Sequence, residues 1–230
     1  MSTLFDAHCH LQDLAPDEVA AALARARAAG VTRMACCATR EEDWGAVLDL
    51  AATHPEVVPL LGLHPWYVAS AQPGWAERLE GLLVRSRAGL GECGLDFARR
   101  PVDRERQMAA LRLQLRLAER LQRPIVLHCV RAWGALSLVL REEGVPQAGA
   151  MVHAFGGSAE TARELQRQGL YLSFKGRAEA WTAVREDRLL LESDGPEPAA
   201  VAALLAGAEP SDLARRSQNN AARFFERILG

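Results

Sequence analysis

Residues 4–12 read LFDAHCHLQ, an apolar run that ends in two histidines separated by a single cysteine. In a β-strand, side chains at positions i and i+2 point to the same side, so His8 and His10 face together and Cys9 faces away. Two imidazoles that converge at one strand end form half of a binding site for a divalent metal ion. The pair becomes informative only if other strands of the protein end in the same way.

Further short apolar runs follow along the chain, and stretches with helical periodicity separate them. The expected strands span residues 4–10, 31–38, 56–63, 88–95, 124–130, 150–155, 170–174 and 187–193. The expected helices span residues 16–30, 40–54, 75–87, 102–122, 132–144, 158–169, 198–207 and 211–229.

Strands that alternate with helices indicate parallel βαβ units and an α/β protein. Eight such units in 230 residues fit a (β/α)8 TIM barrel that ends in a C-terminal helix. A doubly wound open sheet is the alternative. No low-complexity linker or Pro/Gly/Ser-rich hinge interrupts the pattern, so we expect one domain over residues 1–230.

The composition is that of an ordinary globular protein, with 49% apolar residues, 24% charged residues and a formal charge of −2. No apolar stretch reaches the ~20 residues that span a bilayer, and the first residues do not resemble a signal peptide. A soluble cytoplasmic protein without membrane contact is expected. The five cysteines form no CxxC pair and are interpreted as buried free thiols in a reducing compartment.

The basic residues are arginines with one exception, Lys175. Most of the arginines are interspersed with acids along the expected helices, which is typical of solvated faces. This pattern argues against an extended surface for duplex nucleic acid but leaves room for a pocket that holds one or two phosphates.

The other expected strands also end in polar residues that suit a metal site. In a (β/α)8 barrel the carboxyl ends of all strands open on one face, where the active site lies. Six such side chains are too many for one tetrahedral ion and suit two ions that share a bridging carboxylate. The candidate ligands are His8, His10, Glu92, His128, His153 and Asp194.

The order of the strands suggests how two ions would divide these ligands. The first and last strands of a closed barrel are neighbours, so the two histidines of the first strand and Asp194 are assigned to one ion. His128 and His153 are assigned to the other ion, and Glu92 between them is assigned as the bridge.

Several short motifs of the chain resemble the TatD family of metal-dependent deoxyribonucleases, which are amidohydrolase-like TIM barrels. The motifs run in order from residue 4 to about residue 225 and include HCHL, LGLHPW, GECGLDF, PIVLHC, MVHAFGG, LYLSFKG, LLLESDGP and NAARFF. The resemblance implies a two-metal hydrolase that uses the six ligands named above. It also implies cleavage of phosphodiester bonds in DNA, with single strands or strand ends as the expected substrate.

The expected mechanism uses a water held between two divalent ions, Zn²⁺, Mn²⁺ or Mg²⁺, which loses a proton more readily than bulk water. Asp194, with one carboxylate oxygen free, is predicted to be the general base beside the bridging Glu92. His64 corresponds to the histidine of the family's GxHP motif. We expect it to lie too far round the rim to bind metal and to contact the substrate or leaving group; orienting a metal ligand is the alternative.

Further contacts to the substrate are predicted in two loops. Arg131, close behind His128, is a candidate to hold a phosphate. Gly156 and Gly157 come just before an expected helix, where free backbone amides favour an anion. The alternative there is a tight turn with Ser158 as the helix N-cap. Trp66 and Trp133 are candidates to stack on a base, or to fill packing space.

The chain departs from the family pattern in the loops next to Asp194. About a dozen residues separate Phe174 from the last expected strand, fewer than is usual in the family, and only Glu197 and Pro198 remain of a loop signature. A hydrolase of another ester or amide, for example one that deacylates aminoacyl-tRNA, is therefore the second hypothesis. A barrel that binds metal without catalysis is the third.

Overall fold

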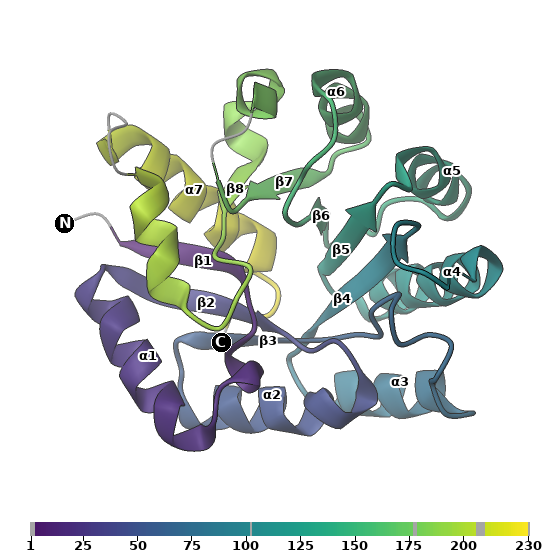
Figure 1. Cartoon of the computed structure of the whole chain (residues 1–230), viewed down its shortest axis with the longest axis horizontal. Coiled ribbons are helices and arrows are strands. Elements are labelled where there is room, and N and C mark those ends of the chain that lie inside the picture. Colours follow the sequence, from purple (N-terminus) through teal and green to yellow (C-terminus); the bar gives the residue numbers. More distant parts are fainter. Residues whose placement is uncertain (1–2, 102, 177–178, 206–209, 230) are drawn as a thin grey trace.

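The computed structural model describes residues 3–101, 103–176, 179–205 and 210–229 (Figure 1). Its eight strands form one parallel sheet in the order β1 to β8. The strands are β1 (Leu4–Cys9), β2 (Val31–Cys37), β3 (Val57–Leu61), β4 (Gly89–Asp96), β5 (Ile125–Val130), β6 (Ala150–Val152), β7 (Tyr171–Phe174) and β8 (Leu189–Leu191).

The helices surround this sheet on its outer side (Figure 1). The α-helices are α1 (Pro16–Ala28), α2 (Glu41–Thr53), α3 (Trp75–Arg85), α4 (Arg104–Leu121), α5 (Trp133–Glu143), α6 (Ala159–Arg167) and α7 (Pro210–Phe225). Four 3₁₀ helices lie in connections of the described chain: η1 (Leu11–Asp13), η2 (Glu179–Ala183), η3 (Glu186–Arg188) and η4 (Pro198–Leu205).

The first and last strands meet at their carboxyl ends, which makes the sheet a nearly closed barrel. The backbone N–H of Asp194 donates to the carbonyl of His8 at 3.0 Å, and that of His10 donates to the carbonyl of Gly195 at 2.9 Å. The predicted (β/α)8 barrel is therefore confirmed, and the open doubly wound sheet is excluded.

The expected helices agree with the structure except near the end of the chain. Residues 198–205 form the 3₁₀ helix η4 instead of an α-helix, and its Val201 is fully buried. The connection from β7 to β8 contains η2 and η3, two short 3₁₀ helices that periodicity did not predict, since 3₁₀ turns leave too few residues for a repeating pattern.

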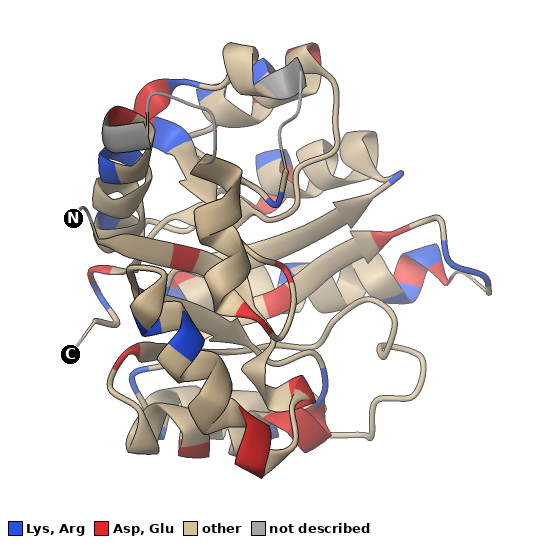
Figure 2. Cartoon of the chain, turned by 60° about the vertical axis from the view of Figure 1, so that its left-hand side comes forward, with Lys and Arg blue, Asp and Glu red and all other residues tan. Residues whose placement is uncertain are grey.

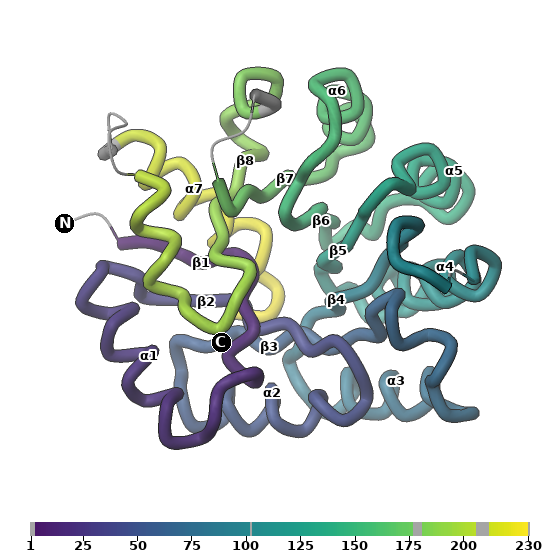
Figure 3. Tube along the Cα trace, in the orientation of Figure 1, coloured from purple at the N-terminus to yellow at the C-terminus, as the bar shows by residue number. Residues whose placement is uncertain are grey.

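Two apolar cores lie on the two sides of the sheet. The larger one packs α1 to α6 against the outside of the strands, and all five cysteines are buried free thiols, as predicted. The smaller core fills the barrel interior, where α7 contributes Phe224 and Phe225. The ring of Phe225 stacks on Phe5 of β1 with centroids 5.1 Å apart. Figure 3 shows α7 running beside β1 and β8, so the expected C-terminal helix is present and packs against the first and last strands.

Ion pairs link the outer helices to one another. Arg116 of α4 pairs with Glu143 of α5 at 2.7 Å, and Arg120 of α4 pairs with Glu80 of α3. Figure 2 shows basic and acidic residues interspersed over the helices, in agreement with the solvated faces that the sequence predicts. Exposed pairs of this kind contribute little stability, usually below about 1 kcal/mol each. Among the described residues, no helix has the length and apolar character needed to cross a membrane.

Glycines allow β3, β4 and β5 to approach one another closely. A Cβ atom on Gly62 would lie 2.8 Å from the backbone of Gly91, and one on Gly94 would lie 2.0 Å from the carbonyl oxygen of His128. Gly94 also has φ +143°, a conformation that residues with a Cβ rarely adopt. These contacts bring the ends of the three strands together, and with them the polar residues that the strands carry.

We predict that Gly94→Ala lowers the free energy of unfolding by roughly 2–4 kcal/mol, because β4 and β5 must move apart and the φ angle becomes strained. Urea denaturation measures this. Gly45→Ala is the matched control, since Gly45 lies in α2 with no atom within 4 Å of the added Cβ. The control should be more stable than the parent protein by about 0.5–1 kcal/mol. A Gly94 variant as stable as the control would contradict the close approach.

Candidate metal centre

The carboxyl ends of the strands enclose a cavity of about 510 Å³. In a TIM barrel this face holds the active site. Five of the six predicted ligands line the cavity, and the sixth, His8, is fully buried directly beneath them. The lining ligands are His10, Glu92, His128, His153 and Asp194.

The buried carboxylate of Glu92 lies at the centre of the cluster. Its Oε2 lies 3.3 Å from Nε2 of His8 and 3.4 Å from Nε2 of His10. Its Oε1 faces three other rings, at 3.2 Å from His64, 2.9 Å from His128 and 2.7 Å from His153. The two oxygens thus face two separate groups of imidazoles, which is the arrangement expected of a bridging carboxylate.

The first group matches the donor spacing of a tetrahedral metal ion. Ligand atoms about 2.0–2.1 Å from one tetrahedral ion lie roughly 3.3 Å from one another. The two Nε2 atoms of His8 and His10 are 3.1 Å apart, and each lies 3.3–3.4 Å from Oε2 of Glu92. These three atoms therefore fit one face of a tetrahedron.

The tautomers of two histidines leave the correct nitrogen free to bind a metal ion. Nδ1 of His10 lies 3.0 Å from the carbonyl oxygen of Cys37, which only accepts, so Nδ1 carries the proton and Nε2 faces Glu92 with its lone pair. Nε2 of His128 lies 3.4 Å from the carboxylate of Asp96 and carries the proton, which leaves the lone pair of Nδ1 free to bind a metal ion. Hydrogen bonds of this kind commonly orient histidine ligands.

His64 belongs to this cluster, contrary to the prediction that it lies too far round the rim. The loop after β3 turns back into the barrel mouth, and His64 is buried with Nε2 3.2 Å from Glu92. Its Nδ1 accepts a hydrogen bond from the backbone N–H of Trp66 at 3.2 Å, so the neutral ring has its proton on Nε2 and donates it to Glu92. This geometry agrees with the alternative, in which His64 orients a ligand. Burial lowers the pKa of His64 and keeps the ring neutral.

Asp194 lies at the edge of the cluster and makes contacts on both carboxylate oxygens. Its Oδ1 lies 3.7–3.8 Å from the Nε2 atoms of His8 and His10. Its Oδ2 accepts a hydrogen bond from Nζ of Lys175 at 2.6 Å. The prediction of a free second oxygen is therefore wrong, because Lys175 reaches across from the end of β7.

The neighbouring side chains keep both carboxylates of the cluster ionised. Burial alone would raise the pKa of Glu92, but the surrounding imidazoles, that of His153 first, outweigh it and hold that pKa well below the usual range. Burial also opposes ionisation of Asp194, yet the nearby imidazoles of His10, His153 and His8 and the ammonium group of Lys175 lower its pKa below the ordinary value. Ionised oxygens are the form that binds a divalent ion.

Two further buried acids hold the strand ends in place. The carboxylate of Asp6 accepts hydrogen bonds from the backbone N–H of His8 at 3.2 Å and from the N–H and hydroxyl of Ser193 at 2.9 and 2.6 Å. Glu192 accepts from the N–H of Ala154 at 2.6 Å and from the hydroxyl of Ser173. These bonds fix the backbone on which His8, His153 and Asp194 stand.

The predicted substrate contacts in two loops do not reach the cavity of the described chain. Arg131 is exposed and lies outside the cavity lining. Ser158 is the N-cap of α6 and accepts from the N–H of Thr161 at 3.1 Å, as in the alternative interpretation. Gly156 and Gly157 also lie outside the lining, and a Cβ on Gly157 would meet the ring of Phe155 at 2.7 Å. Packing explains this glycine.

Sequence reasoning missed four residues of the site. Lys175 and Arg40 line the cavity with positive charge, while Asp96 and Glu192 support the histidines. Lys175 had a signal, because it is the only lysine and directly follows an expected strand. Of the two tryptophans, Trp66 lines the cavity and is 45% exposed. Trp133 packs against Phe155 with ring centroids 5.0 Å apart.

A parallel eight-stranded barrel that presents clustered histidines and carboxylates at the carboxyl ends of its strands defines a metal-dependent hydrolase. The chain belongs to the TatD-related DNase family, whose sequence profile matches residues 5–223. The resemblance seen in the sequence motifs is thus confirmed.

Two curated relatives illustrate this membership. The chain is 34% identical over 207 residues to an uncharacterized metal-dependent hydrolase, YjjV of Escherichia coli K12, covering 84% of this chain and 79% of the relative. It is 33% identical over 189 residues to the 3'-5' ssDNA/RNA exonuclease TatD of Cronobacter sakazakii, covering 76% and 70% of the two chains.

Solved structures show the same fold. The crystal structure of the TatD homologue YjjV from E. coli superimposes with a TM-score of 0.88 at 27% identity, covering 97% of this chain and 98% of that one. A TatD-family hydrolase from Entamoeba histolytica shares the fold with a TM-score of 0.83 at 16% identity, covering 98% and 99%.

We predict that adding Zn²⁺ or Mn²⁺ to metal-stripped protein raises the melting temperature, because an ion that binds only the folded state stabilises it. Glu92→Gln should weaken metal binding by more than about 100-fold, beyond the usual effect of losing a supporting residue. Calorimetric titration and elemental analysis measure both. Glu105→Gln on the exposed first turn of α4 is the control and should bind like the parent. Equal affinities of the two variants would remove Glu92 from the site.

Proposed function

We propose that this protein is a nuclease that removes nucleotides from the 3' end of single-stranded DNA with the help of two divalent ions. The observation that carries the proposal is the Glu92 carboxylate, whose two oxygens face two groups of imidazoles at the floor of an open cavity. The relative from C. sakazakii, named a 3'-5' ssDNA/RNA exonuclease, supports the polarity and the substrate.

The residues of the cluster fit two ions that share Glu92. His8, His10 and Asp194 would hold one ion, as the distances of 3.1 Å between the two Nε2 atoms and 3.7–3.8 Å from these atoms to Oδ1 of Asp194 suggest. His128 and His153 would hold the other, with His64 as the residue that orients Glu92. Bound there, the ions would polarise the phosphate and make a water molecule more acidic. The nitrogen-rich donor set favours Zn²⁺ or Mn²⁺ over Mg²⁺.

Asp194 and Lys175 are the side chains that would act on the substrate. Asp194 is ionised and lies at the edge of the cluster, where it can accept a proton from the attacking water. Lys175 is 58% exposed in its side chain, so its ammonium group reaches the open mouth while it holds Oδ2 of Asp194. A cation in this place would hold a phosphate oxygen and fix the orientation of Asp194 at the same time.

The cellular setting that we propose is the cytoplasm. All five thiols are free and buried, which suits a reducing compartment.

We predict that Asp194→Asn slows the shortening of single-stranded DNA at least about 100-fold, because proton acceptance and ion binding are both impaired. A strand labelled at its 5' end, incubated with Mg²⁺, Mn²⁺ or Zn²⁺, should give a ladder of products shortened from the 3' end. Asp49→Asn, an exposed change in α2, is the matched control and should retain the parent rate.

The same experiment tests the alternative substrates. The parent protein is also given small aryl esters, lactones and an aminoacyl-tRNA. Turnover of one of these without shortening of DNA by any of the three ions would refute the nuclease and favour a hydrolase of that ester. Equal DNA cleavage by Asp194→Asn and Asp49→Asn would remove Asp194 from the mechanism.

We predict that Lys175→Met raises KM for single-stranded DNA by about tenfold and also lowers kcat, because a phosphate contact is lost and Asp194 is freed. Lys175→Arg keeps the charge and should recover most of the KM effect but less of kcat, since the guanidinium places its donors differently. Steady-state kinetics on the labelled strand separate the two parameters. A Met variant with parental KM and kcat would show that Lys175 contacts only solvent and Asp194.

A further inference from the structure

The cavity lined by His10, Glu92, His128, His153 and Asp194 is called the metal cavity below. The loop between β3 and α3 separates it from two smaller hollows on the same face. Trp66 lines both the metal cavity and the first hollow, which has a volume of about 240 Å³. Arg40 and Tyr67 line both the metal cavity and the second hollow, of about 350 Å³. A polymeric ligand with one end in the metal cavity could therefore extend into either of the two hollows.

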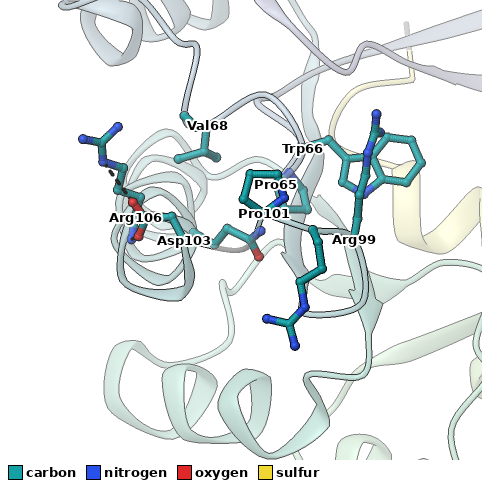
Figure 4. Close-up of a pocket in the computed structure, with 10 residues that line it drawn as sticks. Pro65, Trp66, Val68, Arg99, Pro101, Asp103 and Arg106 are labelled. Carbon is teal, nitrogen blue, oxygen red and sulfur yellow. Dashed lines mark hydrogen bonds and ion pairs between the residues drawn. The ribbon is translucent and has the colours of Figure 1, made fainter.

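The two hollows differ in charge. The first is lined by Arg99, Arg100 and Arg106 against one acid, Asp103. Figure 4 shows Arg99 beside the ring of Trp66 and Arg106 next to Asp103 on the other side of the hollow. Arg106 pairs with Asp103 at 3.2 Å, whereas no carboxylate in the described part of the chain forms an ion pair with Arg99 or Arg100.

The second hollow has the opposite character. Its lining has two acids, Glu41 and Glu42, and one arginine, Arg40. The guanidinium of Arg40 is already paired with Asp43 at 3.2 Å. Glu41 is in turn paired with Arg78 at 2.7 Å, so the second hollow offers a polyanion no excess of free positive charge. The polyanion is therefore attracted to the first hollow, because unpaired guanidinium groups bind phosphate oxygens.

The wall shared by the metal cavity and the first hollow is held in a fixed position. The indole Nε1 of Trp66 donates to Asp96 at 2.6 Å, and Asp96 also contacts His128 of the metal cluster. Arg99 lies over the same indole, with Cζ 4.2 Å from the ring centroid. The cation–π contact holds the Arg99 guanidinium beside the exposed ring, where its N–H groups can bind a phosphate oxygen.

We propose that the hollow of Arg99, Arg100 and Trp66 binds the phosphodiester backbone of a single strand next to the linkage that lies at the metal cluster. This inference rests on the proposed nuclease function and adds the path of the strand. The end of the strand enters the metal cavity, the chain passes over Trp66, and the following phosphates lie against the two arginines. The hollow therefore favours strands of several nucleotides over mononucleotides.

Binding of strands of graded length tests this path. Thymidine strands of one to six nucleotides carry a fluorescent label at the 5' end and phosphorothioate linkages, which keep the charge and resist cleavage. Fluorescence anisotropy with the metal-loaded protein gives Kd at several salt concentrations. The test variant is Arg99→Ala with Arg100→Ala. The control is Arg85→Ala with Arg167→Ala, which removes two exposed arginines in the last turns of α3 and α6.

For the hexanucleotide, the test variant should bind about tenfold more weakly, and the slope of log Kd against log salt should fall by about 1.4, or 0.7 for each lost phosphate contact. For the mononucleotide, the loss should be below about twofold. The control should bind both ligands like the parent. Unfolding midpoints of both variants are measured in parallel, and they should agree with each other.

Three results would overturn the path: an equal loss at every strand length, an equal loss in the control, or no loss. The binding measurement does not depend on cleavage. If the parent shortens no strand but the length-dependent loss is present, the subsite stands and the nuclease proposal falls. If the parent shortens DNA and the test variant has parental Kd values at every length, the nuclease stands and the subsite falls.

Discussion

The buried carboxylate of Glu92 is the group on which the rest of the site depends. An ionised acid inside a barrel costs several kcal/mol unless cations or hydrogen bonds compensate it. Here five histidine nitrogens lie 2.7–3.4 Å from its two oxygens. The surrounding features serve this arrangement: glycines let β3, β4 and β5 approach, and Asp6 holds Ser193 beneath His8. The cavity is thus a charged cluster for which the barrel provides rigid supports.

The rim of the barrel determines what reaches this cluster. On one side Lys175 places a cation against Asp194, and on another Trp66 joins the metal cavity to the hollow of Arg99 and Arg100. The outer surface carries acids and bases in nearly equal numbers, with a formal charge of −2 for the whole chain. Attraction of an anion is therefore local to the mouth, where Lys175, Arg99 and Arg100 lie, and the remaining surface contributes little to it.

Much of the fold and of the metal cluster could be predicted from the sequence, for a physical reason. Strands buried on both faces are continuously apolar, so a histidine or acid within such a run or near its end stands out, as Glu92 and His128 do. The rest depends on backbone paths that carry no periodic signal. His64 joins the cluster because its loop turns inward, and Lys175 reaches Asp194 across two strand ends. Gly157 looked like an anion site, yet its environment is the ring of Phe155.

The contact between Asp6 and Ser193 joins residues that are 187 positions apart in the chain. The clustered histidines and carboxylates come from both halves of the chain, and Asp194 follows the last strand, β8. A polypeptide still growing on the ribosome therefore lacks the complete set of ligands. The cluster is therefore completed only after β8 has been made and has docked beside β1.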